Sequence, residues 1–384
     1  VLGGGSETDA AGMAEVVSWN LGSVPGVNEL EASVDGVQSV VFSAAAVPDV
    51  PDRITILEGN GQSGEVGTVL NLPPTVLVTD RLGNPLAGVQ VDFLPEANGG
   101  TLADGKQVTG SSGAAASGPW TLGTRAGIQS VRISVVGVDP VFISATAVPG
   151  PAVSALSLVE DSQMGTVGAE VPAPPGVRVE DAFGNGVPGT PVLFSLGEGP
   201  GSLGTPGAID GAEAVSGADG TAAALSWTLG TAVGLYEVSA AVGGLPGTIS
   251  FRAVAMPGEA RMVAIRSGNN QSAPRGTSIS VPPSVVVTDR FENRVPGVSV
   301  LFSVVEGGGE VNGAEVLTDG EGVAEVTSWT LGPSEGANLL SATVEGLDPA
   351  TFQAFALSAP PFQVSRVAGQ GQSGSVGSPL PVSY

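Results

Sequence analysis

Residues 298 to 304 read Val-Ser-Val-Leu-Phe-Ser-Val, and this stretch decides the fold. Its first, third, fifth and seventh residues are apolar, with Phe302 in the set, and two of the three residues between them are serine. A period of two is typical of a strand with one buried face and one wet face. Similar runs recur between Gly, Pro, Asn and Asp breaks, roughly every eight to twelve residues. The pattern predicts an all-β chain of immunoglobulin-like antiparallel sandwiches.

The chain is internally repetitive. All four tryptophans stand in the phrase Trp-x-Leu-Gly, at spacings of about 101, 107 and 102 residues: Trp19, Trp120, Trp227 and Trp329. A second landmark, a glutamine five residues before a glycine, keeps the same order: Gln62, Gln163, Gln271 and Gln372. A fixed period near 100 residues indicates a tandem array of similar domains.

The landmarks divide the chain into five parts. We expect the C-terminal part of a repeat in 1–47, complete repeats in 48–148, 149–256 and 257–358, and the N-terminal part of a further repeat in 359–384. We call the complete units the first, second and third repeats. Further chain is expected to complete both partial units, by continuation of the same array or by a strand from a neighbouring subunit.

Short segments with prolines, such as 47–51 and 148–151, separate the repeats. Proline fixes φ, so these segments predict semi-rigid joints. Strands of 7 to 10 residues, at about 3.3 Å per residue, make each domain roughly 30 to 40 Å long. The array is therefore expected to be a stiff rod about 150 Å long.

The large aromatic residues are candidate core residues. We expect the tryptophans to be buried plugs, because a large aromatic at one point of every unit is more often core than a ligand platform. The facing layer should be the phenylalanines of the alternating strands: Phe93, Phe194 and Phe302. Trp329 has the parity of Leu331 but not of Val326, so either a bulge intervenes or the inward face switches.

One aspartate per repeat begins an Asp-x-x-Gly-Asn or Asp-x-x-Glu-Asn turn: Asp80, Asp181 and Asp289. A tight turn selects this residue, because its carboxylate accepts hydrogen bonds from nearby backbone N–H groups. The alternative is a calcium ligand at a domain end. Calcium prefers six to eight oxygens, and no dense acidic ladder supplies them. We therefore interpret these residues as structural.

The composition excludes several classes of function. Net charge is −24, from 13 basic and 37 acidic residues, which argues against a nucleic-acid partner. Cysteine and histidine are absent, so zinc sites and Ser-His or Cys-His catalysis are excluded. Glycine patterns at 59–64, 199–204 and 369–374, and a near phosphate loop at 100–106, lack a following helix and are interpreted as turns. We expect no cofactor, no metal, no membrane span and no enzymatic activity.

The order of these motifs resembles the bacterial Ig-like domains of the invasin and intimin adhesins. The best copy runs from Asp289 through the strand 298–304 and a Thr-Asp-x-x-Gly turn at 318–322 to Trp329. The corresponding turn in 48–148 departs from the pattern, because it reads Gly-Ser-Ser-Gly at 110–113 where Thr-Asp is expected. The resemblance implies a bacterial protein that is secreted or exposed on the cell surface.

Three functions are compatible with such an array. The leading hypothesis is the shaft of a surface adhesin or extracellular fibre, whose partners are further copies of the same repeat. One alternative is a glycan- or host-protein-binding module, since sandwich loops can bind ligands. The other is a spacer attached to a catalytic domain. The fold alone does not decide among them, and the sequence does not identify a receptor.

Overall fold

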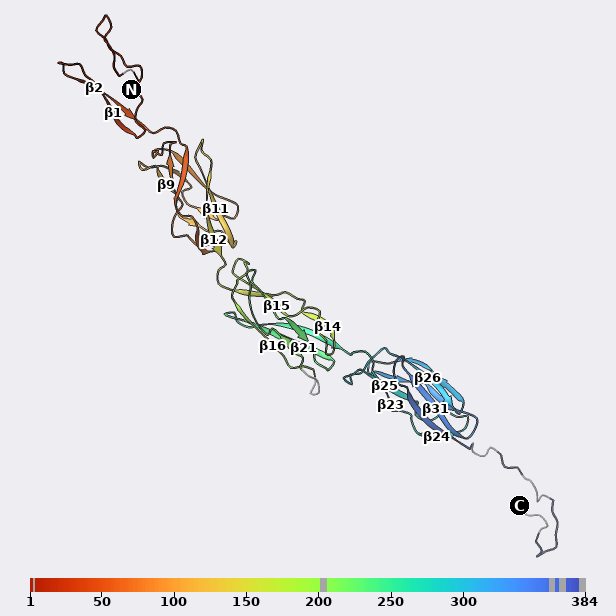
Figure 1. Cartoon of the computed structure of the whole chain (residues 1–384). Coiled ribbons are helices and arrows are strands. Elements are labelled where there is room, and N and C mark those ends of the chain that lie inside the picture. Colours follow the sequence, from red (N-terminus) through yellow and green to blue (C-terminus); the bar gives the residue numbers. More distant parts are fainter. Residues whose placement is uncertain (3, 201–205, 359–362, 366–370, 380–384) are drawn as a thin grey trace.

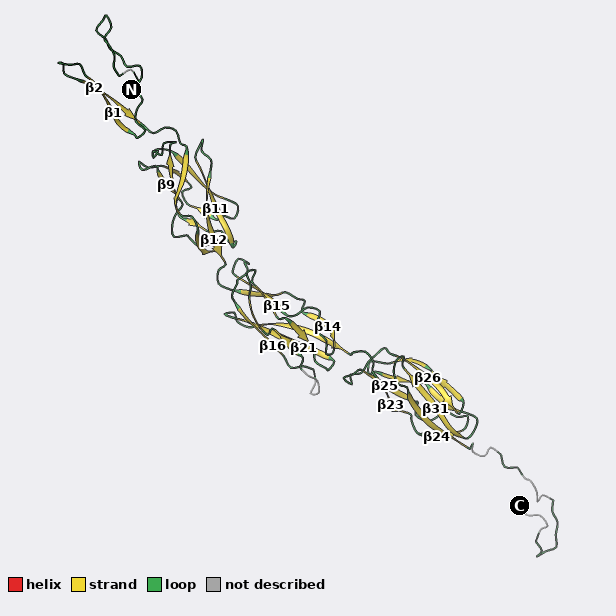
Figure 2. Cartoon of the chain, viewed as in Figure 1, coloured by secondary structure: helices red, strands yellow, loops and turns green. Residues whose placement is uncertain are grey.

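The computed structural model describes residues 1–2, 4–200, 206–358, 363–365 and 371–379. Three sandwiches follow one another along a single line, and the N-terminal segment lies beyond the first of them (Figure 1). The described residues form strands and loops and contain no helix (Figure 2). The predicted all-β fold is confirmed. Consistent with this, the described part of the chain offers no helix that could cross a membrane.

Each complete repeat has ten strands. The first repeat contains β3 (Arg53–Glu58), β4 (Gln62–Glu65), β5 (Thr75–Thr79), β6 (Gln90–Pro95), β7 (Thr101–Leu102), β8 (Lys106–Val108), β9 (Ala114–Ala116), β10 (Trp120–Thr121), β11 (Gly127–Ser134) and β12 (Val141–Val148). The second contains β13 (Ser154–Ser157), β14 (Ser162–Thr166), β15 (Gly176–Glu180), β16 (Pro191–Leu196), β17 (Ala208–Asp210), β18 (Glu213–Val215), β19 (Thr221–Ala223), β20 (Ser226–Thr228), β21 (Gly234–Val242) and β22 (Thr248–Met256). The third contains β23 (Met262–Ser267), β24 (Gln271–Pro274), β25 (Ser284–Thr288), β26 (Ser299–Glu306), β27 (Gly309–Asn312), β28 (Glu315–Leu317), β29 (Val323–Glu325), β30 (Ser328–Leu331), β31 (Gly336–Thr343) and β32 (Ala350–Leu357).

The strands form the same sheets in every repeat. In the first repeat, a five-stranded sheet has the order β4-β12-β11-β6-β8, a three-stranded sheet has the order β3-β5-β9, and β7 pairs with β10. The second and third repeats repeat this topology strand for strand. All pairs are antiparallel except β4 with β12, β14 with β22 and β24 with β32, which are parallel. The antiparallel sandwich therefore carries one parallel pair per repeat, a feature that the sequence does not predict.

The inward face changes along the chain before each tryptophan, as the third repeat shows. Val326 and Trp329 are both buried, although they lie three residues apart. Strand β29 pairs with β25 in the three-stranded sheet, whereas β30 pairs with β27 in the two-stranded sheet. The chain thus crosses from one sheet to another between Val326 and Trp329. The sequence leaves open either a bulge or a switch of the inward face, and the structure shows the switch.

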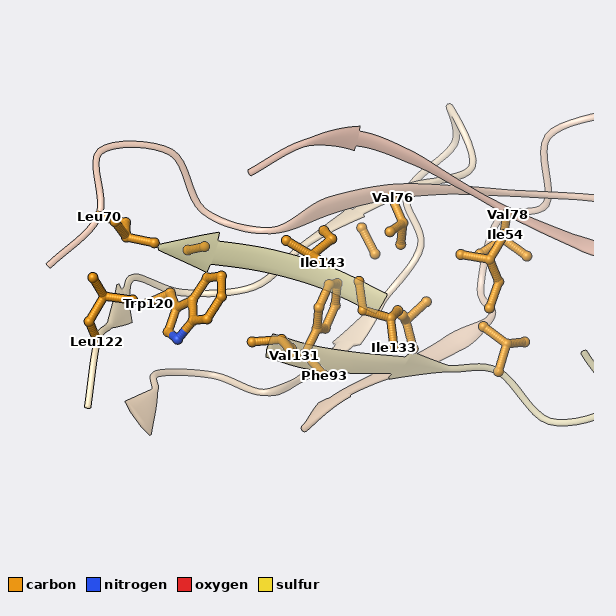
Figure 3. Packing of buried hydrophobic residues seen from close by; sticks show 14 of the residues in the cluster. Ile54, Leu70, Val76, Val78, Phe93, Trp120, Leu122, Val131, Ile133 and Ile143 are labelled. Carbon is orange, nitrogen blue, oxygen red and sulfur yellow. The ribbon is translucent and has the colours of Figure 1, made fainter. Parts of the chain in front are cut away.

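The alternating strands bury their apolar faces in one core per repeat. In the first repeat, Phe93 lies beside Val131, and Trp120 closes one end of the cluster with Leu70 and Leu122 (Figure 3). The aromatic residues of the second and third cores pair at 6.3 Å between ring centroids, Phe194 with Phe251 and Phe302 with Phe352. Aromatic burial of this kind is a large part of core stability.

The N-terminal segment contains one hairpin, β1 (Gly26–Ala32) with β2 (Val40–Ala46). Leu30 lies opposite Phe42 across this hairpin, and the Phe42 side chain is 54% exposed. The hairpin therefore has an apolar face that no described part of the chain covers.

Candidate functional site

The turn that begins with the repeated aspartate lies where one repeat meets the preceding one. We call residues 80–84, 181–185 and 289–293 the aspartate turns. Asp181 is 3% exposed, and its Oδ1 accepts hydrogen bonds from the N–H groups of Phe183 (2.8 Å) and Asn185 (2.9 Å) within the turn. Its Oδ2 accepts from the side-chain amide of Asn185 (2.9 Å) and from the N–H of Gly150 in the linker (3.0 Å). The carboxylate thus ties the turn to the entry of its own repeat.

The other two turns are built in the same way. Asp80 accepts from Leu82, from Asn84 and from the linker N–H of Asp49, and Asp289 accepts from Phe291, from Asn293 and from the linker N–H of Gly258. A carboxylate has about four lone-pair sites, and each of these carboxylates accepts four or more hydrogen bonds. The arrangement leaves no free oxygen for calcium and supports the structural interpretation of these aspartates. Among the described residues, no three acidic side chains gather into a cluster suited to a metal ion.

The hydrogen bonds also determine the charge of the carboxylates. Burial raises the pKa of Asp80, but the hydrogen bonds from Asn84, Asp49 and Leu82 outweigh it and lower the pKa to about 2. The pKa of Asp181 and that of Asp289 are lowered from the ordinary value by the same balance of burial and hydrogen bonds. All three turns are therefore ionised well below neutral pH.

The asparagine that ends each turn crosses the boundary between repeats. The Asn185 amide donates to the carbonyl of Thr124 in the first repeat (2.8 Å), and its Oδ1 accepts from the N–H of Ala126 (2.9 Å). At the next boundary, Asn293 donates to the carbonyl of Thr231 (2.8 Å) and accepts from the N–H of Val233 (3.2 Å). A side-chain amide that bonds a carbonyl and an N–H two residues apart fixes both position and orientation.

The first repeat makes part of the same contact with the N-terminal segment. Asn84 donates to the carbonyl of Ser23 at 2.9 Å, four residues after Trp19. Trp19 is only partly exposed, although the segment forms a single hairpin. The bond from the asparagine amide to a carbonyl is thus present at three successive boundaries, and the complete pair of bonds at two.

The surface that receives the aspartate turn is built from both sequence landmarks. In the first repeat, the N–H of Gly67 donates to the carbonyl of Gly123 (3.2 Å), and the N–H of Leu122 donates to the carbonyl of Thr68 (2.9 Å). The end of the Trp-x-Leu-Gly strand is therefore bonded to the loop that follows the glutamine. We call residues 66–70 with 120–126, and 167–171 with 227–233, the receiving surfaces.

An aromatic residue of the turn packs on the glycine of the receiving surface. A Cβ atom on Gly67 would lie 3.5 Å from the ring of Phe183, and one on Gly168 would lie 3.0 Å from the ring of Phe291. Both glycines have positive φ, 73° and 71°, which a side chain also disfavours. Phe291 packs against the core of the second repeat, and the Arg290 guanidinium lies 4.4 Å from its ring centroid. The landmark glycine thus leaves room for the following repeat.

The landmark glutamine has a separate role inside each repeat. The Gln62 amide donates to the carbonyl of Leu72 (2.8 Å), and its Oε1 accepts from the N–H of Leu72 (3.0 Å). Gln163 and Gln271 make the same pair of bonds to Ala173 and Val281. These bonds hold the start of the parallel edge strand against the chain that leads into the next strand of the sandwich.

In the first and second repeats, the tryptophan singled out in the sequence lies behind the receiving surface, whereas Trp19 of the N-terminal segment is only half-buried. Trp120, Trp227 and Trp329 are fully buried, and the phenylalanines of the facing strands are 2% to 3% exposed. The carbonyl of Trp120 accepts from the N–H of Leu70, so the plug supports the loop that meets the next repeat. The aspartates and tryptophans therefore belong to opposite sides of one joint. Sequence reasoning missed the backbone groups of the receiving surface, and the asparagine repeated at the end of every aspartate turn marks only the other side of the joint.

A cleft of about 650 Å³ lies beside the joint between the first and second repeats. It is lined by residues of both repeats, including Arg125 and Arg178. Arg178 pairs with Glu180 and donates to the carbonyls of Gly184 and Asp219, each at 3.3 Å. Arg178 is therefore paired inside the second repeat. We interpret the cleft as part of the joint, because both repeats line it.

The glycine patterns are turns where the structure describes them. Residues 59–61 form a turn with positive φ at Gly59 and Gly61, and residues 62–64 of the pattern belong to strand β4. Residues 100–106 lead from β7 through a turn into β8. The patterns at 199–204 and 369–374 lie partly outside the described residues.

Comparison with known proteins identifies the fold. No protein-family model and no curated protein sequence matches the chain. Among solved structures, the Escherichia coli adhesin FdeC is 19% identical, covers 80% of this chain and 99% of its own, and has a TM-score of 0.52. The repeats have the fold of bacterial Ig-like adhesin domains.

Two further structures have lower scores. Invasin, a bacterial integrin-binding protein, is 17% identical over 80% of this chain and 61% of its own, with a TM-score of 0.42. InvD of Yersinia pseudotuberculosis is 18% identical over 78% of this chain and 96% of its own, with a TM-score of 0.43.

Proposed function

We propose that this chain is a length of the shaft of a bacterial surface adhesin or extracellular fibre. Its role is spatial: it holds another part of the assembly at a distance from the cell. The single observation that carries the proposal is the joint, which has the same hydrogen bonds at successive boundaries. Similarity to the FdeC adhesin supports a place on the cell surface.

Each joint restricts both bending and rotation. The linker N–H of Gly150 is held by Asp181, so the entry of the second repeat cannot swing away from its own turn. Asn185 then bonds two backbone groups of the first repeat, and Phe183 covers Gly67. The Asn185 and Phe183 contacts join the two repeats at separate points, so they restrict how the second repeat can turn on the first. An array of such joints is a rod and not a flexible string of domains.

The partners of the array, in this proposal, are further copies of the same repeat. The aspartate turn and the receiving surface lie at opposite ends of a repeat, so contacts run head to tail in one direction. Head-to-tail contacts extend an array without closing it. We place no catalytic step in this segment, because its repeated features are all used in the core and the joints.

Small-angle X-ray scattering of the whole chain tests the proposal. We expect the maximum dimension of the wild-type chain to be that of an extended rod. In the double variant Asn185→Ala, Asn293→Ala, the maximum dimension should be smaller and the distribution of interatomic distances broader. Asn312→Ala is the matched control, because Asn312 bonds Ser328 inside the third repeat. A wild-type chain as compact and heterogeneous as the double variant would contradict the rod. Antibody labelling of intact source cells tests the surface location, and a signal only after lysis would contradict it.

A further inference from the structure

The parallel strand pair has a particular place in each repeat. Strand β4 lies near the entry of the first repeat, and β12 leads directly into the joint with the second. The two pair in parallel along one edge of the five-stranded sheet, with Gln62 opposite Ala145 and Glu65 opposite Val148. The same pairing joins β14 to β22 and β24 to β32. The first and last parts of every repeat are thus bonded side by side.

Backbone hydrogen bonds extend this ladder at both ends. In the first repeat, the N–H of Gly61 donates to the carbonyl of Ser144 (2.8 Å), and the N–H of Val66 donates to the carbonyl of Val148 (2.9 Å). In the third repeat, Asn270 donates to Gln353 (2.8 Å) and Arg275 donates to Leu357 (2.9 Å). Where β12 pairs with β4, its inward side chains are the buried Ala145 and Ala147, so water is excluded from that side of the ladder.

The direction of the strands decides what tension does to this ladder. Force from the preceding repeat reaches β4 at its N-terminal end, through β3. Force from the following repeat reaches β12 at its C-terminal end. Because the strands are parallel, the two forces slide them past each other along their axes. All hydrogen bonds of the ladder are then loaded together, whereas an antiparallel pair whose free ends lie side by side would be peeled apart one bond at a time.

The landmark glutamine adds a second attachment to the loaded strand. In the third repeat, Gln271 is the first residue of β24, and its side chain bonds the N–H and the carbonyl of Val281. Strand β24 cannot slide without breaking these two bonds as well as the ladder. A hydrogen bond contributes about 0.5 to 1.5 kcal/mol in water and more when water is excluded.

From this geometry we propose that the array bears tension, and that the parallel pair is the load-bearing element of each repeat. This inference rests on the proposed role as a shaft, and it adds a mechanical function to the spatial one. The pairs concerned are β4 with β12, β14 with β22 and β24 with β32. Strand β3 lies earlier in the force path and pairs with β5, as its counterparts do in the other repeats. The test must therefore separate the β3–β5 ladder from the β4–β12 ladder.

Single-molecule force spectroscopy of the whole chain provides that test. The chain has no cysteine, so handles can be attached through cysteines added at its two ends. The three cores predict three unfolding events. Arg275→Pro removes the N–H that donates to Leu357 at an exposed position of the third repeat. We expect one event of the three to unfold roughly two- to tenfold faster at a given force, the equivalent of one lost hydrogen bond.

The matched control places proline on the opposite edge of the same sheet. Val316 is the middle residue of β28, which pairs only with β26 among the described strands and lies outside the force path. Its N–H faces β26, because Ala314 and Thr318 on either side of it bond Phe302 and Val298. Val316→Pro should therefore lower equilibrium stability in denaturant without changing the unfolding force. Gln271→Ala is a milder second variant, and we expect it to act in the same direction as Arg275→Pro.

The outcomes are distinct. Faster unfolding under force in Arg275→Pro and Gln271→Ala, but not in Val316→Pro, supports the inference. Equal effects of the two prolines on force, or no effect of either Arg275→Pro or Gln271→Ala, would overturn it. Scattering of the same variants shows whether the rod persists, so a failure of the load-bearing pair can be told apart from a failure of the shaft.

Discussion

Alanine at the landmark glycine of each repeat should separate the backbone cost from the cost of the joint. Gly67, Gly168 and Gly276 have φ of 73°, 71° and 76°. A left-handed conformation costs a side chain about 1 to 2 kcal/mol, and alanine recovers about 0.4 to 1 kcal/mol from the unfolded chain. All three variants should therefore lose about 1 kcal/mol of repeat stability.

The contact made by the new methyl group differs among the three sites. At Gly276 it meets no described atom within 4 Å, at Gly67 it meets the Phe183 ring at 3.5 Å, and at Gly168 it meets the Phe291 ring at 3.0 Å. The distance at Gly67 is ordinary van der Waals contact, whereas the ring facing Gly168 must move. We expect looser coupling between repeats in Gly168→Ala, little change in Gly67→Ala, and none in Gly276→Ala.

Two assays measure these two effects. Amide hydrogen exchange reports the stability of each repeat. Nuclear magnetic relaxation, measured for each repeat within the whole chain, reports whether neighbouring repeats tumble together. Equal loss of coupling between repeats in all three variants would refute the reasoning, because the positive φ that the three glycines share would then explain the effect without the contact to the ring. A joint unchanged by Gly168→Ala would refute it as well.

Three further predictions concern the cores and the turns. Trp227→Ala and Phe302→Ala should each cost about 3 to 5 kcal/mol within their own repeats, and unchanged thermal unfolding in both would contradict the core assignment. Because the pKa of Asp80 is lowered to about 2, the stabilisation by its turn should be complete above about pH 4 and be lost as the pH falls through 2, and an acid titration followed by fluorescence checks this sign. Glu292 has a φ of 67° where the other turns have glycine, so Glu292→Gly should stabilise the third repeat by about 0.5 to 1 kcal/mol in denaturant, and a loss of stability would count against strain at this residue.

The alternating stretch that predicted the fold is observed as strand β26. Val300 and Phe302 are buried there, and Ser299 and Ser303 face water. Such a pattern is readable because each side chain reports its own environment along a regular strand. The repeat spacing is readable for a similar reason, since equivalent positions carry the same residue.

The joint and the parallel pair could not be read in this way. Asn185 binds a carbonyl and an N–H of the first repeat, and backbone groups have no sequence signature. The aspartate turn was recognisable, but its link to Gly150 depends on how the chain enters the sandwich. Strand β4 has only four residues, three of them polar and the other glycine, so its partner is decided by the sheet edge that tertiary packing leaves open.

The most direct test of the rigid joint is a distance distribution across it. Ser195 and Ser303 occupy equivalent exposed positions of β16 and β26 in adjacent repeats, and cysteines placed there can carry spin labels without competition from native cysteine. Pulsed electron spin resonance should give one narrow distance distribution in the otherwise unaltered chain, and Asn293→Ala should broaden it. A broad distribution before the substitution, or the same narrow one after it, would contradict the account of the joint.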